Sequence, residues 1–495
     1  MKAAELSAPA LAQIANRSGR PLRILLVRSS PVARGVRGPM AAPVAAPLGV
    51  LYLTAALRQA LGDAVVVEAA SLSTEVETES DIASFVAGRA PDVVGISASL
   101  ADEDEAATLV EAARRLDPPA LTILGGPYPT CAAERALDRT DADLAVAGEA
   151  EHTIVALIET LLAGREPWGV PGVVAPGAHG ALRASVPAEL IADLDTLALP
   201  AWDAIPIEAF TRLRNHNDWP PLQHPYAPIL TSRGCPYCCS YCHNIHGRRY
   251  RARSPDNVLR EVELLHHRHG VRELHVVDDI FNLDGPRMEA ICRGLIQRGL
   301  GISIAFPNAL RGELLTRPQL ELLRDAGCYS INVSLESASP RILERMRRKV
   351  DLDRLAQSIR TAVEVGLMVG CFVMFGYPGE TPEDLELTFE WLRRSWVDFP
   401  RHAIVAPFPG TEAAAHARER GLDPAVMESG RGSYEWANAG LADMPPEEFK
   451  RRIHDGLQSI AEEPRRQRRM RELWQRWPET DIPLMGHPPP AAEEP

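Results

Sequence analysis

The 495-residue chain lacks the long apolar segments that a membrane protein or a secreted precursor needs. No run of about 18 apolar residues occurs, so no transmembrane helix is predicted. Residues 1–20 contain no apolar core of the signal-peptide kind, and we expect them to be a disordered lead-in. An excess of positive charge is also missing. The net charge of −13 argues against a general nucleic-acid binder.

Cysteine is scarce, and its distribution argues against a disulfide framework. The chain has eight cysteines, and four of them fall within residues 235–242. Secreted domains that depend on disulfides are short and rich in cysteine, unlike this chain. We therefore expect a protein of the reducing cytoplasm.

Three of the clustered cysteines have a spacing that suits metal chemistry. Cys235, Cys239 and Cys242 form the pattern C-x3-C-x2-C. Three thiolates on one loop can bind three irons of a cubane cluster and leave the fourth iron open for a small molecule. A zinc knuckle is the alternative, because two histidines follow closely, but no second C-x2-C pair does. Cys238 is a spare thiol, and a small buried side chain is its simplest interpretation.

The cysteine pattern, with Tyr241 before its last member, resembles the signature of radical S-adenosylmethionine (radical SAM) enzymes. The phrase TSRGCPY at residues 231–237 resembles the subgroup with an N-terminal cobalamin-binding domain. The resemblance implies a 4Fe-4S cluster on Cys235, Cys239 and Cys242. It also implies S-adenosylmethionine (SAM) and cobalamin as further cofactors.

Alternating strand and helix patterns predict an α/β protein. A first series of apolar runs predicts a doubly wound, Rossmann-like sheet, with strands at 22–28, 64–68, 92–97, 121–124 and 143–147. A second series predicts six strand–helix units, with strands at 228–231, 273–277, 303–306, 330–335, 367–375 and 403–406. Six units match the partial (β/α)6 TIM-type barrel of radical SAM enzymes.

These patterns divide the chain into six parts. After the lead-in (1–20) we expect a cobalamin-binding domain (21–164), a linker (165–227), the radical SAM barrel (228–415), a mostly helical C-terminal region (416–480) and a disordered tail (481–495).

Small and polar residues follow three strands of the first series, where such sheets bind ligands. The segments are 46–52, 95–99 and 125–127. By itself a Gly-Gly pair after a strand is more often just a tight turn. In this order the segments resemble the cobalamin-binding domain, which implies contacts from Leu48, Gly49, Tyr52, Ser97, Ser99, Gly125, Gly126 and Glu149. The motif D-x-H-x-x-G, whose histidine binds cobalt in some members, is absent. We therefore expect that no protein histidine serves as the lower axial ligand of cobalt.

Polar motifs also follow the strands of the second series, at the edge where barrel enzymes do their chemistry. Asp278 and Asp279 are costly after a buried strand unless a cation meets them, and Asp284 is the better helix cap. The guanidinium of Arg311 can donate two parallel hydrogen bonds to a carboxylate. An arginine that is solvated at the surface is an equally good interpretation. The resemblance implies SAM contacts from Tyr241, Asp278, Asp279, Arg311, Glu336, Gly376 and Pro378.

Two arginine-rich stretches have less certain roles. The run at 248–253 either recognises an anion or is solvated. Arg253, with the Ser-Pro that follows it, resembles a phrase of the same family, which implies that Arg253 points inward. Residues 465–471 contain five arginines, and residues 465–477 also carry two tryptophans. We favour packing of this helix on the barrel over contact with a membrane or an acidic partner.

The resemblance implies radical chemistry on a small-molecule substrate. An electron from a donor such as flavodoxin or ferredoxin would reach the cluster, and SAM would be cleaved to a 5′-deoxyadenosyl radical. The first hypothesis is a cobalamin-dependent methyltransferase acting on an unactivated carbon. The second is an oxidative or ring-forming enzyme without methyl transfer, similar to anaerobic protoporphyrin ester cyclases. The third is a cofactor-binding sensor without catalysis. The residues identify no substrate and no catalytic side chain.

Overall fold

The computed structural model describes residues 14, 19–30, 46–176, 182–211, 221–408, 410–421 and 440–476. The predicted tail and most of the predicted lead-in lie outside the described residues. The chain divides into two compact units. Described residues up to 211, together with 244–252, belong to the first, and residues 221–243 and those from 253 onward belong to the second. Within the described part, no helix has the length and apolar character to cross a bilayer.

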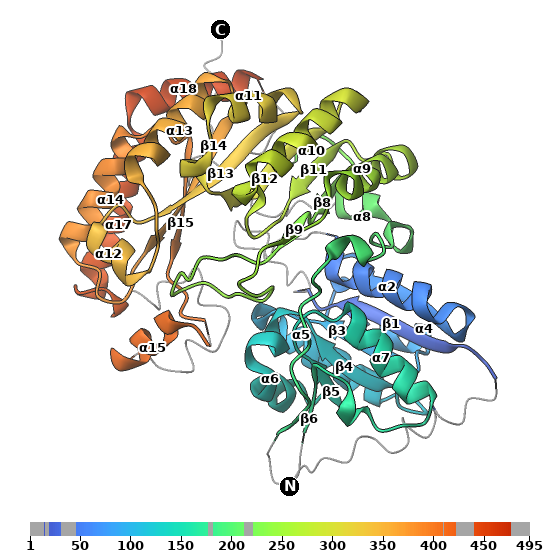
Figure 1. Ribbon diagram of the computed structural model, residues 1–495. Helices are drawn as coiled ribbons and strands as arrows, with labels where there is room; N and C mark the ends of the chain where they lie inside the picture. The colour runs from blue at the N-terminus through green and yellow to red at the C-terminus, as the bar shows by residue number, and fades with distance from the viewer. Residues whose placement is uncertain are drawn as a thin grey trace. The chain divides into compact units, whose positions relative to one another are not determined.

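The first unit is built on a parallel sheet that is wound in two directions (Figure 1). The strand order begins β2-β1-β3-β4-β5, with bounds Leu22–Arg28 for β1, Val65–Ser71 for β2, Val93–Ser97 for β3, Leu121–Gly125 for β4 and Leu144–Val146 for β5. Right-handed crossovers in the two directions place helices on opposite faces, which explains why the strands are apolar runs. The predicted doubly wound fold is confirmed.

The helices of the first unit form two groups that match this winding. Helices α2 (Leu48–Leu61) and α7 (Glu151–Leu162) contact each other. Helices α4 (Asp81–Arg89), α5 (Glu103–Arg114) and α6 (Pro127–Thr140) form the other contacting series. The short helices α3 (Leu72–Glu75) and α8 (Ile207–Thr211) complete the set described here.

Two strands from the predicted linker extend this sheet. Strands β6 (Val173–Pro176) and β7 (Leu182–Ala184) continue the order after β5, and both are antiparallel to their neighbours. Strand β7 is exposed along its whole length. The linker prediction missed these strands because each is too short to produce a clear hydrophobic period.

The second unit contains an open sheet of six parallel strands, as predicted for a partial barrel. The order is β15-β14-β13-β12-β11-β8, with bounds Tyr226–Ile229 for β8, Glu273–Val276 for β11, Ser303–Leu310 for β12, Cys328–Glu336 for β13, Met368–Phe375 for β14 and Phe399–Ile404 for β15. The sixth strand was predicted too late, at 403–406. Pro400 lies within it, which is tolerated because β15 is at the sheet edge.

Helices follow the strands of the second unit and begin at well-formed caps. Ser254, Asp284, Ser339, Asp351 and Thr381 each accept a backbone N–H bond in the first turn of their helix. The helices are α9 (Pro255–His269), α10 (Gly285–Arg298), α11 (Arg317–Asp325), α12 (Pro340–Arg345), α13 (Leu352–Glu364), α14 (Pro382–Arg394) and α15 (Glu412–Glu419). The caps fix where each helix starts relative to the preceding strand end.

Two C-terminal helices pack on this unit, α17 (Pro446–Ala461) and α18 (Pro464–Arg476). In α18, Arg466 is buried and donates to the carbonyls of Leu392 and Val397, while Arg469 pairs with Asp398. Leu473 packs among the buried residues at the amino ends of the strands. These contacts confirm that the arginine-rich helix packs on the barrel.

Candidate active site

The predicted cluster and SAM residues meet at one edge of the second unit. The cysteine loop follows β8, Asp278 and Asp279 follow β11, and Arg311 follows β12. Glu336 ends β13, and the turn containing Gly376 and Pro378 follows β14. Because all six strands are parallel, these positions share the carboxyl edge of the sheet.

The cysteine loop is held at its start and in its middle by backbone and side-chain bonds. At its start, the N–H of Gly234 donates to an Asp279 carboxylate oxygen over 2.9 Å. In its middle, the N–H of Ser240 donates to the Met346 carbonyl over 3.0 Å, and its hydroxyl lies 2.7 Å from that of Tyr377. Ser240 is buried, so this loop is anchored by a residue that sequence reasoning missed.

The three predicted ligand thiols lie within one another's electrostatic field. Loss of solvent raises the pKa of Cys242 to about 12, and the neighbouring Cys239 and Cys235 contribute to the increase. Burial likewise raises the pKa of Cys235, with Cys239 adding to it. A bound cation lowers thiol pKa values. Three thiols on one loop are a donor set that fits an iron–sulfur cluster.

Among the described residues, no three histidine, cysteine, aspartate or glutamate side chains are arranged to hold a single metal ion. The choice of an iron–sulfur cluster over zinc therefore rests on the spacing of the cysteines. Cys238 is exposed, so its predicted burial is wrong.

The two aspartates after β11 differ in what they contact. Asp278 is buried, and its carboxylate accepts bonds of 2.6, 2.6 and 2.5 Å from the Thr231 N–H, the Thr231 hydroxyl and the Ser232 hydroxyl. It therefore joins the end of β8 to the strand beside it. Asp279 holds Gly234 and lies nearer the thiols, since its charge raises the pKa of Cys235.

Arg311 is buried beside the cysteine loop. Its guanidinium stands 3.9 Å from the ring centre of Tyr237, a loop residue, and its Nε donates to Glu313 over 2.7 Å. It also donates to the Lys349 carbonyl. Its Nη1 is buried without a hydrogen-bond partner among the described residues. A buried donor without a partner is costly, and a ligand carboxylate would satisfy it.

Glu336 has an unusual backbone at the end of β13. Its φ of +68° lies in the left-handed region, which is strained for a residue with a side chain. Loss of solvent raises its pKa, opposed by a hydrogen bond from Ser334, the charge of Arg348 and a hydrogen bond from Tyr241. The Ser334 hydroxyl donates directly to the Glu336 side chain. The carboxyl group therefore lies within hydrogen-bond reach of both Ser334 and Tyr241.

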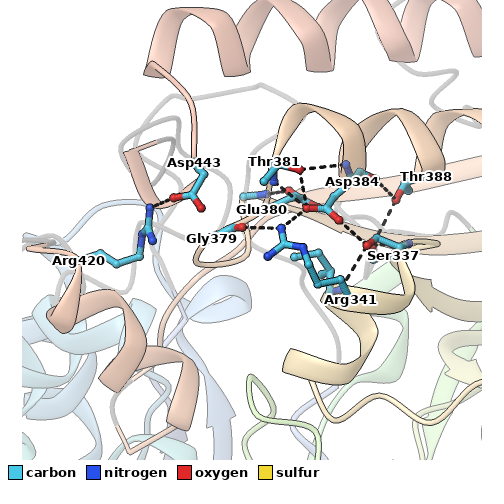
Figure 2. A network of polar contacts seen from close by, with 12 residues as sticks. Ser337, Arg341, Gly379, Glu380, Thr381, Asp384, Thr388, Arg420 and Asp443 are labelled. Carbon is cyan, nitrogen blue, oxygen red and sulfur yellow. Dashed lines mark hydrogen bonds and ion pairs between the residues drawn. The ribbon is translucent and has the colours of Figure 1, made fainter.

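The turn after β14 lies within a network of polar contacts (Figure 2). Gly376 has φ of +77° and donates its N–H to Glu380 over 2.6 Å. A Cβ at this position would lie 3.1 Å from the ring of Phe449 on α17, so only glycine fits without adjustment. Glu380 is fully buried, and burial raises its pKa to about 8. Thr381, the next residue, caps α14.

Arg341 and Asp384 attach the neighbouring helices to this turn. Arg341 of α12 donates to the Gly379 carbonyl over 2.8 Å and pairs with Asp384 of α14. Asp384 also accepts bonds from Ser339 and Thr381. Figure 2 shows Arg341 and Thr381 converging on Asp384. Partial burial favours the neutral form, but these donors lower the pKa of Asp384 to about 2. The turn is therefore held by bonds within the protein.

In the first unit, the predicted cobalamin residues also share a carboxyl edge. Leu48, Gly49 and Tyr52 lie in the first turns of α2, which follows β1. Ser97 ends β3, and Gly125 ends β4. Ligands of doubly wound sheets bind where the winding reverses, here between β1 and β3. A Cβ added to Gly49 would meet no atom within 4 Å, so this position has open space beside it.

Several of these residues have structural contacts that the sequence did not reveal. The Ser99 hydroxyl donates to Asp102 over 2.8 Å in a capping box, which occupies it within the protein. Gly126 has φ of +91°, and a Cβ there would lie 2.9 Å from the Ala98 carbonyl oxygen. Gly126 is thus required by packing between two strand ends. Ser29, Ser30 and Ser71 add buried hydroxyls to this edge, and sequence reasoning missed them.

Glu149 differs most from its expected role. Its carboxylate accepts bonds from Arg251 over 2.7 and 2.8 Å and from the Ile191 N–H over 2.8 Å. Two arginines of the 248–253 run form ion pairs within the protein, since Arg251 pairs with Glu149 and Arg253 pairs with Glu261. Arg253 is buried and points inward.

Two family models match the two units. Residues 229–392 match the radical SAM superfamily and residues 40–158 match the B12 binding domain. The site therefore belongs to a radical SAM enzyme. The chain belongs to the cobalamin-dependent radical SAM family, and its cofactors are a 4Fe-4S cluster, SAM and cobalamin.

Individual relatives agree with this family. An uncharacterized methyltransferase of Pyrococcus horikoshii is 30% identical over 75% of this chain and 78% of its own length. Anaerobic magnesium-protoporphyrin IX monomethyl ester cyclase of Rubrivivax gelatinosus is 25% identical over 73% of this chain and 64% of its own. Among solved structures, this chain is similar to the radical SAM methyltransferase TsrM of Kitasatospora setae with cobalamin and a 4Fe-4S cluster bound. The TM-score is 0.61 at 22% identity, and the match covers 75% of this chain and 72% of that one. This last likeness shows the fold.

Proposed function

We propose that this enzyme methylates an unactivated carbon of a small molecule through SAM-derived radical chemistry. The observation that carries the proposal is the combination, in one chain, of a three-thiol loop at a barrel edge and a cobalamin-binding sheet. When bound, the cluster supplies the electron that cleaves SAM, and cobalamin supplies the methyl group. The protein positions these groups and excludes water.

Residues of the second unit would hold the cluster and SAM. Cys235, Cys239 and Cys242 are the proposed cluster ligands. Arg311 is the proposed partner of the SAM carboxylate, because its buried Nη1 has no other acceptor among the described residues. Asp279 is a better candidate than Asp278 for the SAM ammonium group, because the internal bonds of Asp278 already use both of its oxygens.

The remaining SAM contacts follow from the rigid strand ends. Glu336 would accept bonds from SAM, with Tyr241 beside it. The backbone at Gly376 and Pro378 would face the adenine or ribose, because a turn already fixed by Glu380 loses little entropy on binding.

In the first unit, we propose that Leu48, Gly49, Tyr52, Ser97, Gly125 and Gly126 contact cobalamin. The open space beside Gly49 supports this, as does the position of the group at the winding reversal. Ser99 and Glu149 would shape this edge through their internal bonds.

The cluster needs an external electron, so we also propose a small electron-transfer protein such as flavodoxin or ferredoxin as partner. All eight cysteines are free, which agrees with a reducing compartment such as the cytoplasm.

The proposal is tested by anaerobic turnover of reconstituted enzyme with pools of candidate metabolites. We expect 5′-deoxyadenosine, S-adenosylhomocysteine and a product heavier by one methylene. SAM carrying a deuterated methyl group should label that product. The ring-forming alternative is favoured by the cyclase relative. It predicts 5′-deoxyadenosine without S-adenosylhomocysteine, and that result would reject methyl transfer.

A further inference from the structure

The segment just after the cysteine loop belongs to the other unit of the protein. Residues 244–252 cluster with the first unit, whereas the residues on either side belong to the second. The chain thus enters the cobalamin-binding unit two residues after Cys242 and leaves it before Arg253. Whatever holds this segment also restrains the end of the cysteine loop.

A buried ion pair within the first unit contributes to holding the segment, whose last two residues also form strand β10 (Arg251–Ala252) paired with strand β9 (Ser232–Arg233). Arg251 and Glu149 form a two-pronged contact of 2.7 and 2.8 Å, and each side chain is only 2% exposed. Arg251 also donates to the carbonyls of Ile191 and His246 over 2.7 and 2.6 Å. A forked, fully hydrogen-bonded pair of this kind fixes geometry more strictly than a lysine would.

The same pair connects to the cobalamin edge through one threonine. The Thr130 hydroxyl donates to the Gly126 carbonyl over 2.8 Å and accepts the Gly148 N–H over 3.0 Å. Gly148 precedes Glu149 directly. A continuous path of bonds therefore runs from the Gly125-Gly126 turn through Thr130 and Glu149 to Arg251.

We propose that Arg251 and Glu149 are positioning residues that tie the cysteine loop to the cobalamin edge. They would act on methyl transfer from SAM to cobalt, which needs both units, and not on reductive SAM cleavage, which needs only the second. This inference rests on the proposed function. Such a transfer would break the sulfur–carbon bond of SAM and form a cobalt–carbon bond. Reduced cobalamin would supply the electron pair of the new bond, and S-adenosylhomocysteine would leave with the electron pair of the broken one.

The test compares Arg251→Met, Arg251→Lys and Glu149→Gln with wild type. The control is Arg58→Met, which breaks the exposed Arg58–Asp203 pair of the first unit. Three quantities are measured: methylcobalamin formed from SAM and cobalamin reduced with titanium(III) citrate, 5′-deoxyadenosine formed with dithionite, and amide hydrogen exchange of residues 244–252 in protein without cofactors.

We expect Arg251→Met to slow methylcobalamin formation by about 10- to 100-fold, the range typical of small misplacements. Its 5′-deoxyadenosine yield should stay at the wild-type level, and exchange in 244–252 should accelerate. Glu149→Gln should show the same loss of methylcobalamin formation. Arg251→Lys should show a smaller loss, because lysine keeps the positive charge but cannot form the two-pronged contact. Arg58→Met should show no loss.

Two results would overturn the inference. The first is wild-type methylcobalamin formation in Arg251→Met despite faster exchange in 244–252. The second is an equal loss of both products in that variant, which would indicate general damage. If wild type itself forms no methylcobalamin, the proposed function fails as well, so the two failures are distinguishable.

Discussion

Asp278 illustrates how one residue can resemble a ligand in sequence and serve the fold in structure. Two adjacent carboxylates after a buried strand suggested a cation partner, yet Asp278 accepts three bonds from Thr231 and Ser232. Arg311 shows the opposite case, because its unpartnered buried Nη1 could not be foreseen from sequence. Spacing predicted which residues gather at the strand ends. It could not predict which donors and acceptors are already satisfied.

The cysteine assignment makes a direct prediction at this scale. Cys239→Ala should remove the visible absorbance of the reconstituted cluster and its bound iron, because one of three attachment points is lost. Cys238→Ala is the matched control, since this exposed neighbour lies outside the proposed ligand set. An unchanged spectrum in Cys239→Ala, or a lost one in Cys238→Ala, would overturn the assignment.

Glu380 predicts a pH dependence of stability. Its pKa is raised from an ordinary value of 4.5 to about 8 in the folded protein, because it is buried. Between these two values the folded carboxyl keeps its proton while the unfolded one loses it. The contribution of this group to the free energy of unfolding is therefore fully present below pH 4.5. It decreases as pH rises and levels off above about pH 8.

Glu380→Gln keeps the acceptor for the Gly376 N–H and removes the titration. Thermal unfolding of both proteins is measured at pH steps of about half a unit. The melting temperature of wild type, relative to that of Glu380→Gln, should decrease between pH 5 and pH 8. Parallel curves for the two proteins would contradict the assigned protonation state.

At the scale of elements, the turn after β14 depends on a helix far along the chain. Phe449 of α17 is buried beneath Gly376, and the Gly379 N–H donates to the Leu441 carbonyl over 2.9 Å. The sequence predicted the turn from its glycines and proline. It did not indicate which helix supports it, because such packing depends on tertiary contacts between residues about 70 positions apart.

Phe449→Ala should test this support. Removing a buried aromatic side chain should cost about 3–5 kcal/mol of stability, and the loosened turn should raise the SAM concentration needed for half-maximal 5′-deoxyadenosine formation. Leu387→Ala on α14 is the control, because Leu387 is 44% exposed. A Phe449→Ala enzyme with unchanged SAM dependence would show that α17 does not support the SAM turn.

Element boundaries show where local patterns stop being informative. Strand β15 begins at Phe399 although Pro400 follows, because an edge strand has no partner for the missing N–H on one side. Strands β6 and β7 were absorbed into the predicted linker, since three or four residues give no measurable period. Longer strands, such as β1 and β14, were predicted almost to the residue.

At the scale of the whole molecule, the alternation of strands and helices predicted both α/β units and their order along the chain. The exchange of residues 244–252 between the units was not predicted, because the arginine run containing Arg251 has the composition of a solvated loop. Its partner, Glu149, lies 102 positions away and joins it only in the folded state. Long-range ion pairs of this kind leave no local signal.

The central claim is that cobalamin and radical SAM chemistry cooperate in methyl transfer. The most direct measurement is the yield of S-adenosylhomocysteine and 5′-deoxyadenosine from reduced, cluster-loaded enzyme with and without cobalamin. The account predicts that 5′-deoxyadenosine forms in both cases and that S-adenosylhomocysteine forms only with cobalamin. S-adenosylhomocysteine that forms equally without cobalamin, or that never forms, would contradict it.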